Sequence, residues 1–469
     1  MNGRDMLAGL AAFWREFSRS RSGVAGLVLL LAFVVLAIVG PAVVPFKGAA
    51  EHWRDIGFWQ DNPSAAPPVW INALTWRGRK GVVSAVLARP AFSEEKEQGG
   101  VSVRRYQFTY PYASDEPPRD LVVRLDGHGS IPVDITVKRP DGREVDLYRE
   151  QLDIGESDRP RISVARDCGQ QLIEFLRSQN EELAAGLSAA TIRPASILFS
   201  VIEPGIAVHP RPLAGAYLLT VTALMLDSNA VFAPPALFVS GHVSGILGTD
   251  LSRRDIFTGV IIGIRWALII GILTSLITVV AGVILGVAAA YFGGPIDWLI
   301  SRVYELAYFM PVLPFLIVVS AVYKPSIWTL IVIICLFFWT GPFKPVYGMA
   351  LQIRTETYIE ASRGLGARGG RIIFRHIVPL LLPYTFAVMA LSVPAVIVYE
   401  ASVSLLGLGD SSIVTWGQML HDALSQGAVI DRLWWWVVPP GLMIALMAMS
   451  FAFLGTALDK VLHPRLKRR

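Results

Sequence analysis

Apolar residues gather into long runs near both ends of the chain, separated by short polar segments. A helix needs about 20 apolar residues to cross a bilayer, and most of these runs approach or exceed that length. The runs cover residues 24–46, 257–291, 303–322, 326–341, 377–398 and 435–457. The pattern therefore predicts an α-helical membrane protein with about six transmembrane helices.

The first run, residues 24–46, follows the basic segment REFSRSRSG, which resembles the start of a signal peptide. The run is longer than the apolar region of a usual signal peptide, and no clear A-x-A cleavage pattern follows it. We therefore predict a tail over residues 1–23 and an uncleaved first transmembrane helix over residues 24–46.

Residues 47–246 follow a different pattern, in which apolar and polar positions alternate over short runs. Alternation is typical of strands with one buried face. We expect strands within 104–112, 120–125, 195–204 and 215–226, two more strands joined at the turn residues 140–142, and one helix over 169–187. This block is predicted to be a β-rich, sandwich-like domain inserted between the first and second spans.

Composition supports this division of the chain. Hydrophobic residues make up 53% of the 469 residues and charged residues only 17%, and the mean hydropathy is +0.50. Soluble domains usually carry about a quarter charged residues. Residues 46–255 hold 23 of the 42 Lys+Arg and 26 of the 37 Asp+Glu, so the pI of 9.2 comes from the membrane flanks. No nucleic-acid partner is indicated.

Basic residues also predict how the chain crosses the bilayer, because cytoplasmic loops carry an excess of Lys and Arg. They gather in three places: at Arg4, Arg15, Arg19 and Arg21, over residues 342–376, and in the C-terminal HPRLKRR, where they also suit an anionic lipid surface. We therefore expect both termini to face the cytoplasm, and residues 47–246 to form an extracytoplasmic domain.

Residues for catalysis or cofactor binding do not assemble into any recognisable pattern. No cluster of His, Cys, Asp and Glu has metal-ligand spacing, and no G-x-x-x-x-G-K-[ST] phosphate-binding loop occurs. The two cysteines, Cys168 and Cys335, fall in blocks of different character, so a structural disulfide is not expected. The chain is not expected to be an enzyme or to bind a cofactor itself, and the 47–246 domain reads as a binding or contact module.

The segment YIEASRGLGARGGRIIFRHIVP, residues 358–379, is a short charged hairpin between two apolar runs. Thr357 is a candidate N-cap, and Gly364 and Gly366 are expected to end a two-turn helix. A second short amphipathic piece follows, and Pro379 marks the start of the next span. Small residues at 361 and 362 would let another surface come close.

The spacing Glu360-Ala361-Ser362-x-x-x-Gly366, with Pro379 thirteen residues later, resembles the EAA loop of bacterial ABC importer permeases. The longer string resembles the C-type permease of dipeptide and oligopeptide importers. LGTDLSRRDIF at 247–257 and EASVSLLGLG at 400–409 resemble other stretches of that family in the same order. Leu380 stands where the family commonly has asparagine, and the 47–246 block is far longer than the short loop of a typical member.

The resemblance implies a type I ABC importer permease fold over 247–469, with a cytoplasmic EAA-like coupling loop at 357–379, in the bacterial cytoplasmic (inner) membrane. It implies transport of peptides or similar small solutes, with ATP and Mg²⁺ bound by separate ATP-binding subunits. A related B-type permease and an extracytoplasmic substrate-binding protein are the other implied partners. The implied contacts to the ATPase are Glu360, Ala361, Ser362, Arg363, Gly364 and Gly366.

Two charged residues inside apolar runs are candidates for the transport pathway, because ionisable groups within a membrane are often functional. Glu305 could line a pathway or form a local ion pair with Arg302, and Arg265 could line a pathway or extend outward to water. Gly282-x-x-x-Gly286 favours close helix packing.

The sequence is also compatible with one other class of function. A membrane-anchored sensor or assembly protein with an extracytoplasmic binding domain would also combine spans with a soluble block. Such a protein needs no EAA-like helix, and the helix between two spans would then be a plain surface element. A secondary transporter is less suited, because no inverted duplicate is visible.

Overall fold

The computed structural model describes residues 13–74, 81–98, 101–154, 157–158, 166–189, 192–226 and 230–462. Two basic groups used above to predict orientation, Arg4 and the C-terminal residues 463–469, lie outside these ranges. The chain divides into two compact units: a helical unit of Met1–Arg54 and Phe257–Arg469, and a sheet unit of Asp55–Ile256. Each unit is described by itself.

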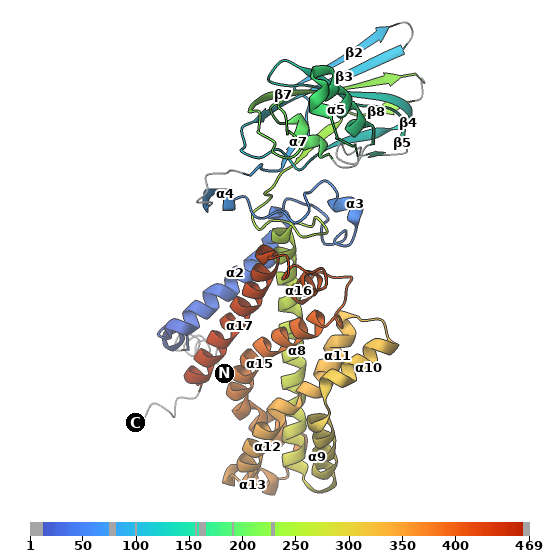
Figure 1. Ribbon diagram of the computed structural model, residues 1–469. Coiled ribbons are helices and arrows are strands. Elements are labelled where there is room, and N and C mark those ends of the chain that lie inside the picture. The colour runs from blue at the N-terminus through green and yellow to red at the C-terminus, as the bar shows by residue number, and fades with distance from the viewer. Residues whose placement is uncertain are drawn as a thin grey trace. The chain divides into compact units, whose positions relative to one another are not determined.

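The helical unit contains the apolar helices and their connections (Figure 1). Its elements are α2 (Arg21–Val43), α8 (Ile256–Phe292), α9 (Gly294–Phe309), α10 (Val312–Val322), α11 (Ile327–Phe338), α12 (Thr340–Arg354), α13 (Thr357–Gly364), α14 (Gly369–Ile372), η1 (Ile373–Ile377), α15 (Val378–Leu405), α16 (Trp416–Ser425) and α17 (Trp434–Leu462). Helix α17 packs against both α2 and α15, and α16 packs against α15 and α17.

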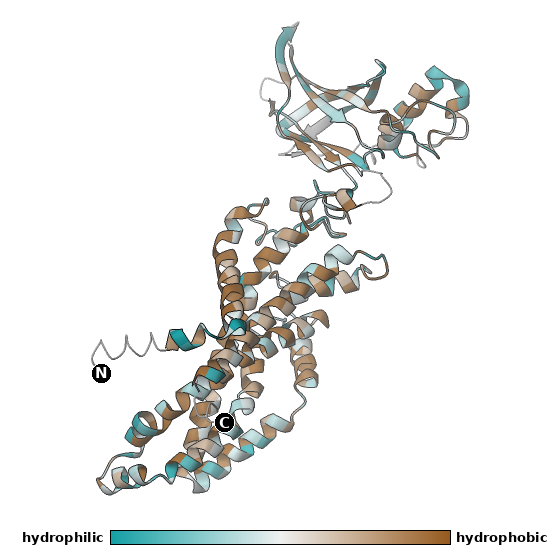
Figure 2. Cartoon of the chain, turned by 90° about the vertical axis from the view of Figure 1, so that its left-hand side faces the viewer, coloured by the Kyte–Doolittle hydropathy of each residue, from teal (hydrophilic) through white to brown (hydrophobic). Residues whose placement is uncertain are grey.

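Five helical segments in the described ranges are long and apolar enough to cross a membrane, and a sixth results if one bent pair counts as a span. The five are Arg21–Val43, Ile256–Phe292, Ile327–Arg354, Gly369–Leu405 and Trp434–Val461. This confirms a helical membrane protein with about six spans. Figure 2 shows these helices mainly in the colour of hydrophobic residues, whereas the strands mix both colours.

The expected span at 303–322 is the bent pair, α9 and α10, which meet at an angle of 81°. Met310 is extended, with φ −72° and ψ 127°, and Pro311 precedes the first turn of α10. A proline disfavours helical geometry at the residue before it and has no N–H to continue the hydrogen-bond ladder. One apolar run therefore folds as two helices in different directions.

Glycines set the contact between α8 and α12. A Cβ on Gly282 would lie 2.5 Å from Cγ of Pro342 and 2.6 Å from the carbonyl oxygen of Trp339. A Cβ on Gly286 would lie 3.0 Å from the carbonyl oxygen of Phe343. Small residues allow such close backbone approach between membrane helices, which confirms the packing role predicted for this pair.

In its described residues, the sheet unit contains nine strands and five short helices. Its strands are β1 (Ala85–Leu87), β2 (Phe92–Gln98), β3 (Val101–Tyr112), β4 (Asp120–Lys138), β5 (Glu144–Ile154), β6 (Ser157–Asp158), β7 (Gly215–Met225), β8 (Val231–Phe232) and β9 (Ala236–Ser240). Its helices are α3 (Ile56–Trp59), α4 (Ile71–Leu74), α5 (Arg166–Gln179), α6 (Glu181–Ala184) and α7 (Pro194–Leu198). The prediction of a β-rich domain is confirmed.

The long strand β4 organises the sheet. It pairs antiparallel with β9 over Asp120–Arg124 and with β5 and β7 over its second half. The main path is β1-β9-β4-β7-β3-β2, with β5, β6 and β8 also on β4. The strands thus form one sheet through β4 rather than the two facing sheets of the expected sandwich. The turn predicted at 140–142 joins β4 to β5, and Gly142 has φ +82°.

Two local predictions in this unit need correction. The helix expected over 169–187 is two helices, α5 and α6, because the Asn180 side chain accepts a hydrogen bond from the Glu182 N–H and starts a new helix. The strand expected over 195–204 is instead the helix α7, in which Pro194 occupies the first turn. Proline is favoured there because its φ suits a helix and its missing N–H is not needed.

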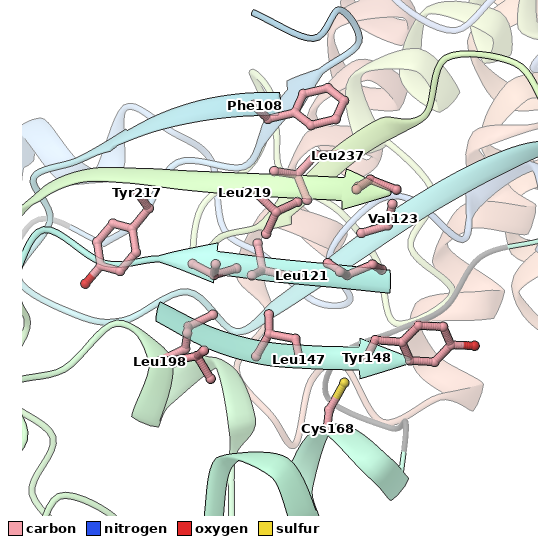
Figure 3. Packing of buried hydrophobic residues seen from close by; sticks show 14 of the residues in the cluster. Phe108, Leu121, Val123, Leu147, Tyr148, Cys168, Leu198, Tyr217, Leu219 and Leu237 are labelled. Carbon is pink, nitrogen blue, oxygen red and sulfur yellow. The ribbon is translucent and has the colours of Figure 1, made fainter. Parts of the chain in front are cut away.

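The core of the sheet unit lies between the curved sheet and α5 (Figure 3). Phe108, Leu121 and Tyr217 on the strands are each about 1% exposed, and Cys168 and Leu172 on α5 are fully buried. Alternation along β4 and β7 places one set of side chains in this core.

Candidate coupling segment and pathway cavity

The segment between α12 and α15 begins with the eight-residue helix α13. Glu356, not Thr357, occupies the N-cap position, and no side chain caps the helix; Thr357 is the first helical residue, so the predicted cap is wrong. The helix ends as expected: the Gly366 N–H donates to the carbonyl of Arg363 at 2.9 Å, and Gly366 has φ +80°. Glycine adopts this conformation without steric cost.

Helix α13 is fixed to the rest of the unit by one apolar and one cationic side chain. Ile359 is fully buried in a cluster that includes Val283 and Val287 of α8. The Arg363 guanidinium lies over the ring of Tyr291, 4.9 Å from its centroid, and a Cβ on Gly369 would lie 3.0 Å from the same ring. Cation–π contacts of this kind stabilise by about 0.5–1 kcal/mol at exposed sites.

Arg354, just before α13, adds a further attachment to α8. Its Nη1 donates to the carbonyl of Ala290 at 2.8 Å, at the end of a helix whose last carbonyls lack helical partners. The end of α8 therefore holds both the approach to α13 and α13 itself. A displacement of α13 must move α8 or break these contacts.

The remaining face of α13 is open. Glu360, Ala361, Arg363, Gly364 and Gly366 are exposed, and Leu365 between the two glycines is 89% exposed. Ser362 is half-buried, and its hydroxyl donates to the carbonyl of Tyr358 at 2.8 Å. Leu365 was not among the predicted contact residues. Its position could have suggested exposure, because a leucine just beyond the last residue of a helix has few neighbours in that helix.

The second amphipathic piece expected after α13 is the beginning of the next long helix. Helix α14 runs directly into the π-helical turn η1, and η1 into α15. Pro379 lies in the first turn of α15, as predicted. Ile372 and Ile377 are fully buried in the cluster that also holds Ile359.

The two charged pathway candidates lie on exposed surfaces. Nη1 of Arg302 donates to Oε2 of Glu305 at 2.5 Å, and both side chains are well exposed, so Glu305 forms the local ion pair that was its alternative reading. Arg265 is exposed on α8. Neither is among the residues that line the cavity of the helical unit described next.

That cavity has a volume of about 410 Å³ and lies between α8, the α11–α12 junction and α15. Most of its walls are apolar, and three hydroxyls line it: Thr278, Thr340 and Ser392. The hydroxyls of Thr278 and Ser392 donate to carbonyls of their own helices, at Thr274 and Met389, and that of Thr340 in α12 donates to the carbonyl of Phe337 in α11. The hydroxyl oxygens that face the cavity can therefore act as hydrogen-bond acceptors. Sequence reasoning missed this site, because hydroxyls within apolar runs carry no distinctive spacing.

Two protein families match the chain. "Binding-protein-dependent transport system inner membrane component" matches residues 282–468, and "N-terminal TM domain of oligopeptide transport permease C" matches residues 10–68. The dipeptide transport system permease protein DppC of Bacillus subtilis is 36% identical over 222 residues, which cover 47% of this chain and 69% of the relative. The chain belongs to the dipeptide/oligopeptide permease family of ABC importers.

Other relatives agree. The oligopeptide transport system permease protein OppC of Bacillus subtilis is 32% identical over 47% of this chain and 72% of its own length. The glutathione transport system permease protein GsiD of Pectobacterium atrosepticum is 32% identical over 55% of this chain and 88% of its own length. This permease is therefore a multi-pass transport subunit of an ABC importer, and the alternative of a membrane-anchored sensor or assembly protein is not favoured.

The strands of the sheet unit, Ala85–Ser240, lie between the two matched segments. The sheet unit is accordingly an insertion between the first apolar helix and the rest of the permease.

Proposed function

We propose that this permease forms part of the translocation pathway for peptides or similar small solutes, and that a separate ATPase drives it through α13. The relatives named above are described as dipeptide, oligopeptide and glutathione transport proteins, which supports the cargo class. The observation that carries the coupling role is a short helix with an open face that is firmly attached to one long helix.

The coupling contact consists of the open face of α13. Leu365 supplies an apolar contact, Glu360 a charge, and Ala361 and Gly364 permit close approach. Gly366 lets the chain turn away after the contact. Ser362 and Arg363 act differently in this proposal, because their side chains bond within the permease and stiffen the segment.

Movement of the ATPase surface would reach the spans through α8. The Arg363–Tyr291 contact and the Arg354–Ala290 hydrogen bond both end on α8, and the buried cluster of Ile359 includes α8 residues. Helix α8 also lines the 410 Å³ cavity. A rigid helix attached at one end can carry displacement along its length. Because α8 lines this cavity, a displacement of α8 would act on a solute that occupies it.

The complete importer in this proposal contains ATP-binding subunits, a related B-type permease and a substrate-binding protein. ATP and Mg²⁺ belong to the ATP-binding subunits. The α13 segment and both termini face the cytoplasm of a bacterial inner membrane, and the sheet unit faces outward, following the distribution of basic residues.

The test is solute-stimulated ATPase activity of the reconstituted importer with Glu360→Arg or Gly364→Trp. Gly364 has no neighbour within 4 Å of a Cβ, so the new side chain projects outward without disturbing α13. Like charges at an interface cost several kcal/mol, and we expect stimulation to fall at least about tenfold, since each 1.4 kcal/mol is a factor of ten.

Matched controls are Glu51→Arg, an exposed acid after α2, and Gly441→Trp on α17, where a Cβ also meets nothing within 4 Å. Both controls should retain stimulation. Normal stimulation in both α13 variants, with assembly intact, would defeat the coupling assignment.

A further inference from the structure

The sheet unit contains a cavity of about 920 Å³ that the transport family does not account for. Its walls come from four places in the unit: the β3–β4 loop, the start of α7, the segment before β7, and His242 shortly after β9. The charged residues among its lining are Asp115, Glu116, Arg119, Arg193 and Arg211, and His209 and His242 add two imidazoles. All of these lie outside the two family matches.

Two arginines in the lining of the cavity offer guanidinium groups to a ligand. Arg193 has no hydrogen-bond or ion-pair partner for its guanidinium among the described residues, and its side chain does not cap α7. Arg119 donates to the carbonyl of Ser64 at 2.9 Å, and burial lowers the pKa of this guanidinium. A partly desolvated guanidinium gains from a carboxylate, which it can bind through two parallel hydrogen bonds.

Glu116 supplies a carboxylate to the lining of the cavity. Oε2 of Glu116 lies 3.6 Å from Nε2 of His242, a contact that is ionic only if the imidazole is protonated. Burial, helped by the charge of Arg119, lowers the pKa of His242, so the ring is neutral at pH 7. The Glu116 carboxylate, which also interacts electrostatically with Arg119, can accept hydrogen bonds from an ammonium group.

The walls are held in place before any ligand binds. Buried Arg139 donates to the carbonyls of Leu198 and Ser200 at the end of α7, at 2.9 and 2.6 Å. The Tyr112 hydroxyl donates to the carbonyl of Glu116 at 2.8 Å. The Val201 N–H donates to the carbonyl of Arg211 at 2.8 Å.

Prolines supply the rigid, apolar part of the lining. They are Pro117, Pro118, Pro210 and Pro212. A proline ring fixes φ and offers no N–H, so these walls suit the side chains or backbone of a ligand with polar ends. The volume falls within the range of about 300–1,000 Å³ that is usual for small-molecule sites.

We propose that this cavity binds a short peptide with both a free carboxylate and a free ammonium group. The carboxylate binds Arg193, with Arg119 nearby, and the ammonium group binds Glu116. The cavity then holds cargo on the sheet unit, apart from the 410 Å³ cavity of the helical unit. The choice of a peptide, rather than another zwitterion, rests on the proposed function.

The test measures binding of trialanine to the full chain alone, in lipid nanodiscs without any ATPase, by isothermal titration calorimetry. Trialanine amide and N-acetyl-trialanine each lack one of the two charges, and we expect each to bind about tenfold more weakly, as loss of one charge-assisted hydrogen bond predicts. The variants Arg193→Ala and Glu116→Gln should weaken trialanine binding to the same degree.

Arg105→Ala is the matched control, because Arg105 is an exposed arginine of β3 outside the cavity. It should bind trialanine as the unaltered chain does. The loss of binding free energy caused by replacing trialanine with trialanine amide and the loss caused by Arg193→Ala should not add up, because both changes delete the same contact.

Three results would overturn the proposal: no trialanine binding at millimolar concentration, unchanged binding in folded Arg193→Ala, or binding of acetate as tightly as trialanine. The last result would show a general anion site. None of these depends on α13, so failure here leaves the coupling test intact, and failure of coupling leaves this binding measurable.

Discussion

The two units use the same apolar residue types for opposite purposes. In the sheet unit Leu121 and Leu172 are at most 1% exposed, whereas in the helical unit Leu306 and Val318 are 66% and 64% exposed. Water drives large apolar side chains into the core of the first unit. Lipid is as apolar as leucine, so it exerts no such force between the helices of the second. Hydrophobicity alone therefore does not distinguish a core residue from a surface residue in this chain.

The residues that form contacts differ accordingly. Large side chains such as Phe108 and Tyr217 fill the core of the sheet unit. In the helical unit, glycines lie at the contacts: Gly26 faces the backbone of α17, where a Cβ would lie 2.7 Å from the carbonyl oxygen of Ser450, and Gly282 faces α12. Adding a methyl group to a helix contact should therefore destabilise the helical unit, whereas deleting methyl groups from the core should destabilise the sheet unit.

The largest expected effect is loss of a core leucine from the sheet unit. Leu172→Ala removes a fully buried side chain between α5 and the sheet and should reduce the free energy of unfolding of that unit by about 2–5 kcal/mol. Leu224→Ala, at a side chain 36% exposed on β7, is the control and should cost about 1 kcal/mol or less. Hydrogen exchange of the β5 and β7 amides measures both. Equal protection in the two variants would contradict the core described here.

A smaller effect is expected from a glycine in the helical unit. Gly282→Ala places a Cβ against Pro342 and Trp339 and should destabilise the α8–α12 contact by about 1–3 kcal/mol. Gly348→Ala on α12, where a Cβ meets nothing within 4 Å, should be neutral or slightly stabilising, because alanine favours helix. Thermal inactivation of the purified permease in detergent distinguishes them. If Gly282→Ala is the more stable of the two, the helices do not approach as described.

The smallest effect concerns pH and only the sheet unit. Because burial lowers the pKa of His242 below its ordinary 6.5, the unfolded chain takes up a proton more readily than the folded unit. The neutral His242 ring contributes fully to the stability of the sheet unit above pH 6.5, and this contribution is lost as the pH falls through the lowered pKa. Protection of the β9 amides, corrected for intrinsic exchange rates, should therefore decline between pH 7.5 and pH 5.5, and His242→Gln should reduce that decline. An identical decline in both proteins would assign it to other groups.

The sequence predicted the features that depend on neighbours along the chain. Apolar runs located the long helices, alternation located β3, β4 and β7, and Gly366 marked the end of α13. The resemblance of the 357–379 segment to the EAA loop pointed to the family that the comparisons then showed. The breaks at Pro194 and Pro311, where a proline redirects the chain, were not predicted. The apolar composition is the same on both sides of such a break, so the apolar pattern does not reveal it.

Features that depend on distant parts of the chain could not be predicted. The contact between Arg363 and Tyr291 joins α13 to α8, and no spacing rule relates the two residues. The same holds for the cavity of the sheet unit, where Glu116, Arg193 and His242 come from separate loops. The exposure of Leu365 follows from where α13 ends relative to the buried cluster, which only the packing determines.

Whether the open face of α13 meets an ATPase is tested most directly by a photo-crosslinker at its tip. The amino acid p-benzoylphenylalanine would replace Leu365, which is 89% exposed, and in a matched control Leu406 at the end of α15, which is 62% exposed. We predict that irradiation of the assembled importer joins position 365 to the ATP-binding subunit and leaves position 406 unattached to it. Crosslinking of position 406 but not 365 to that subunit, or of neither in an active importer, would contradict the account.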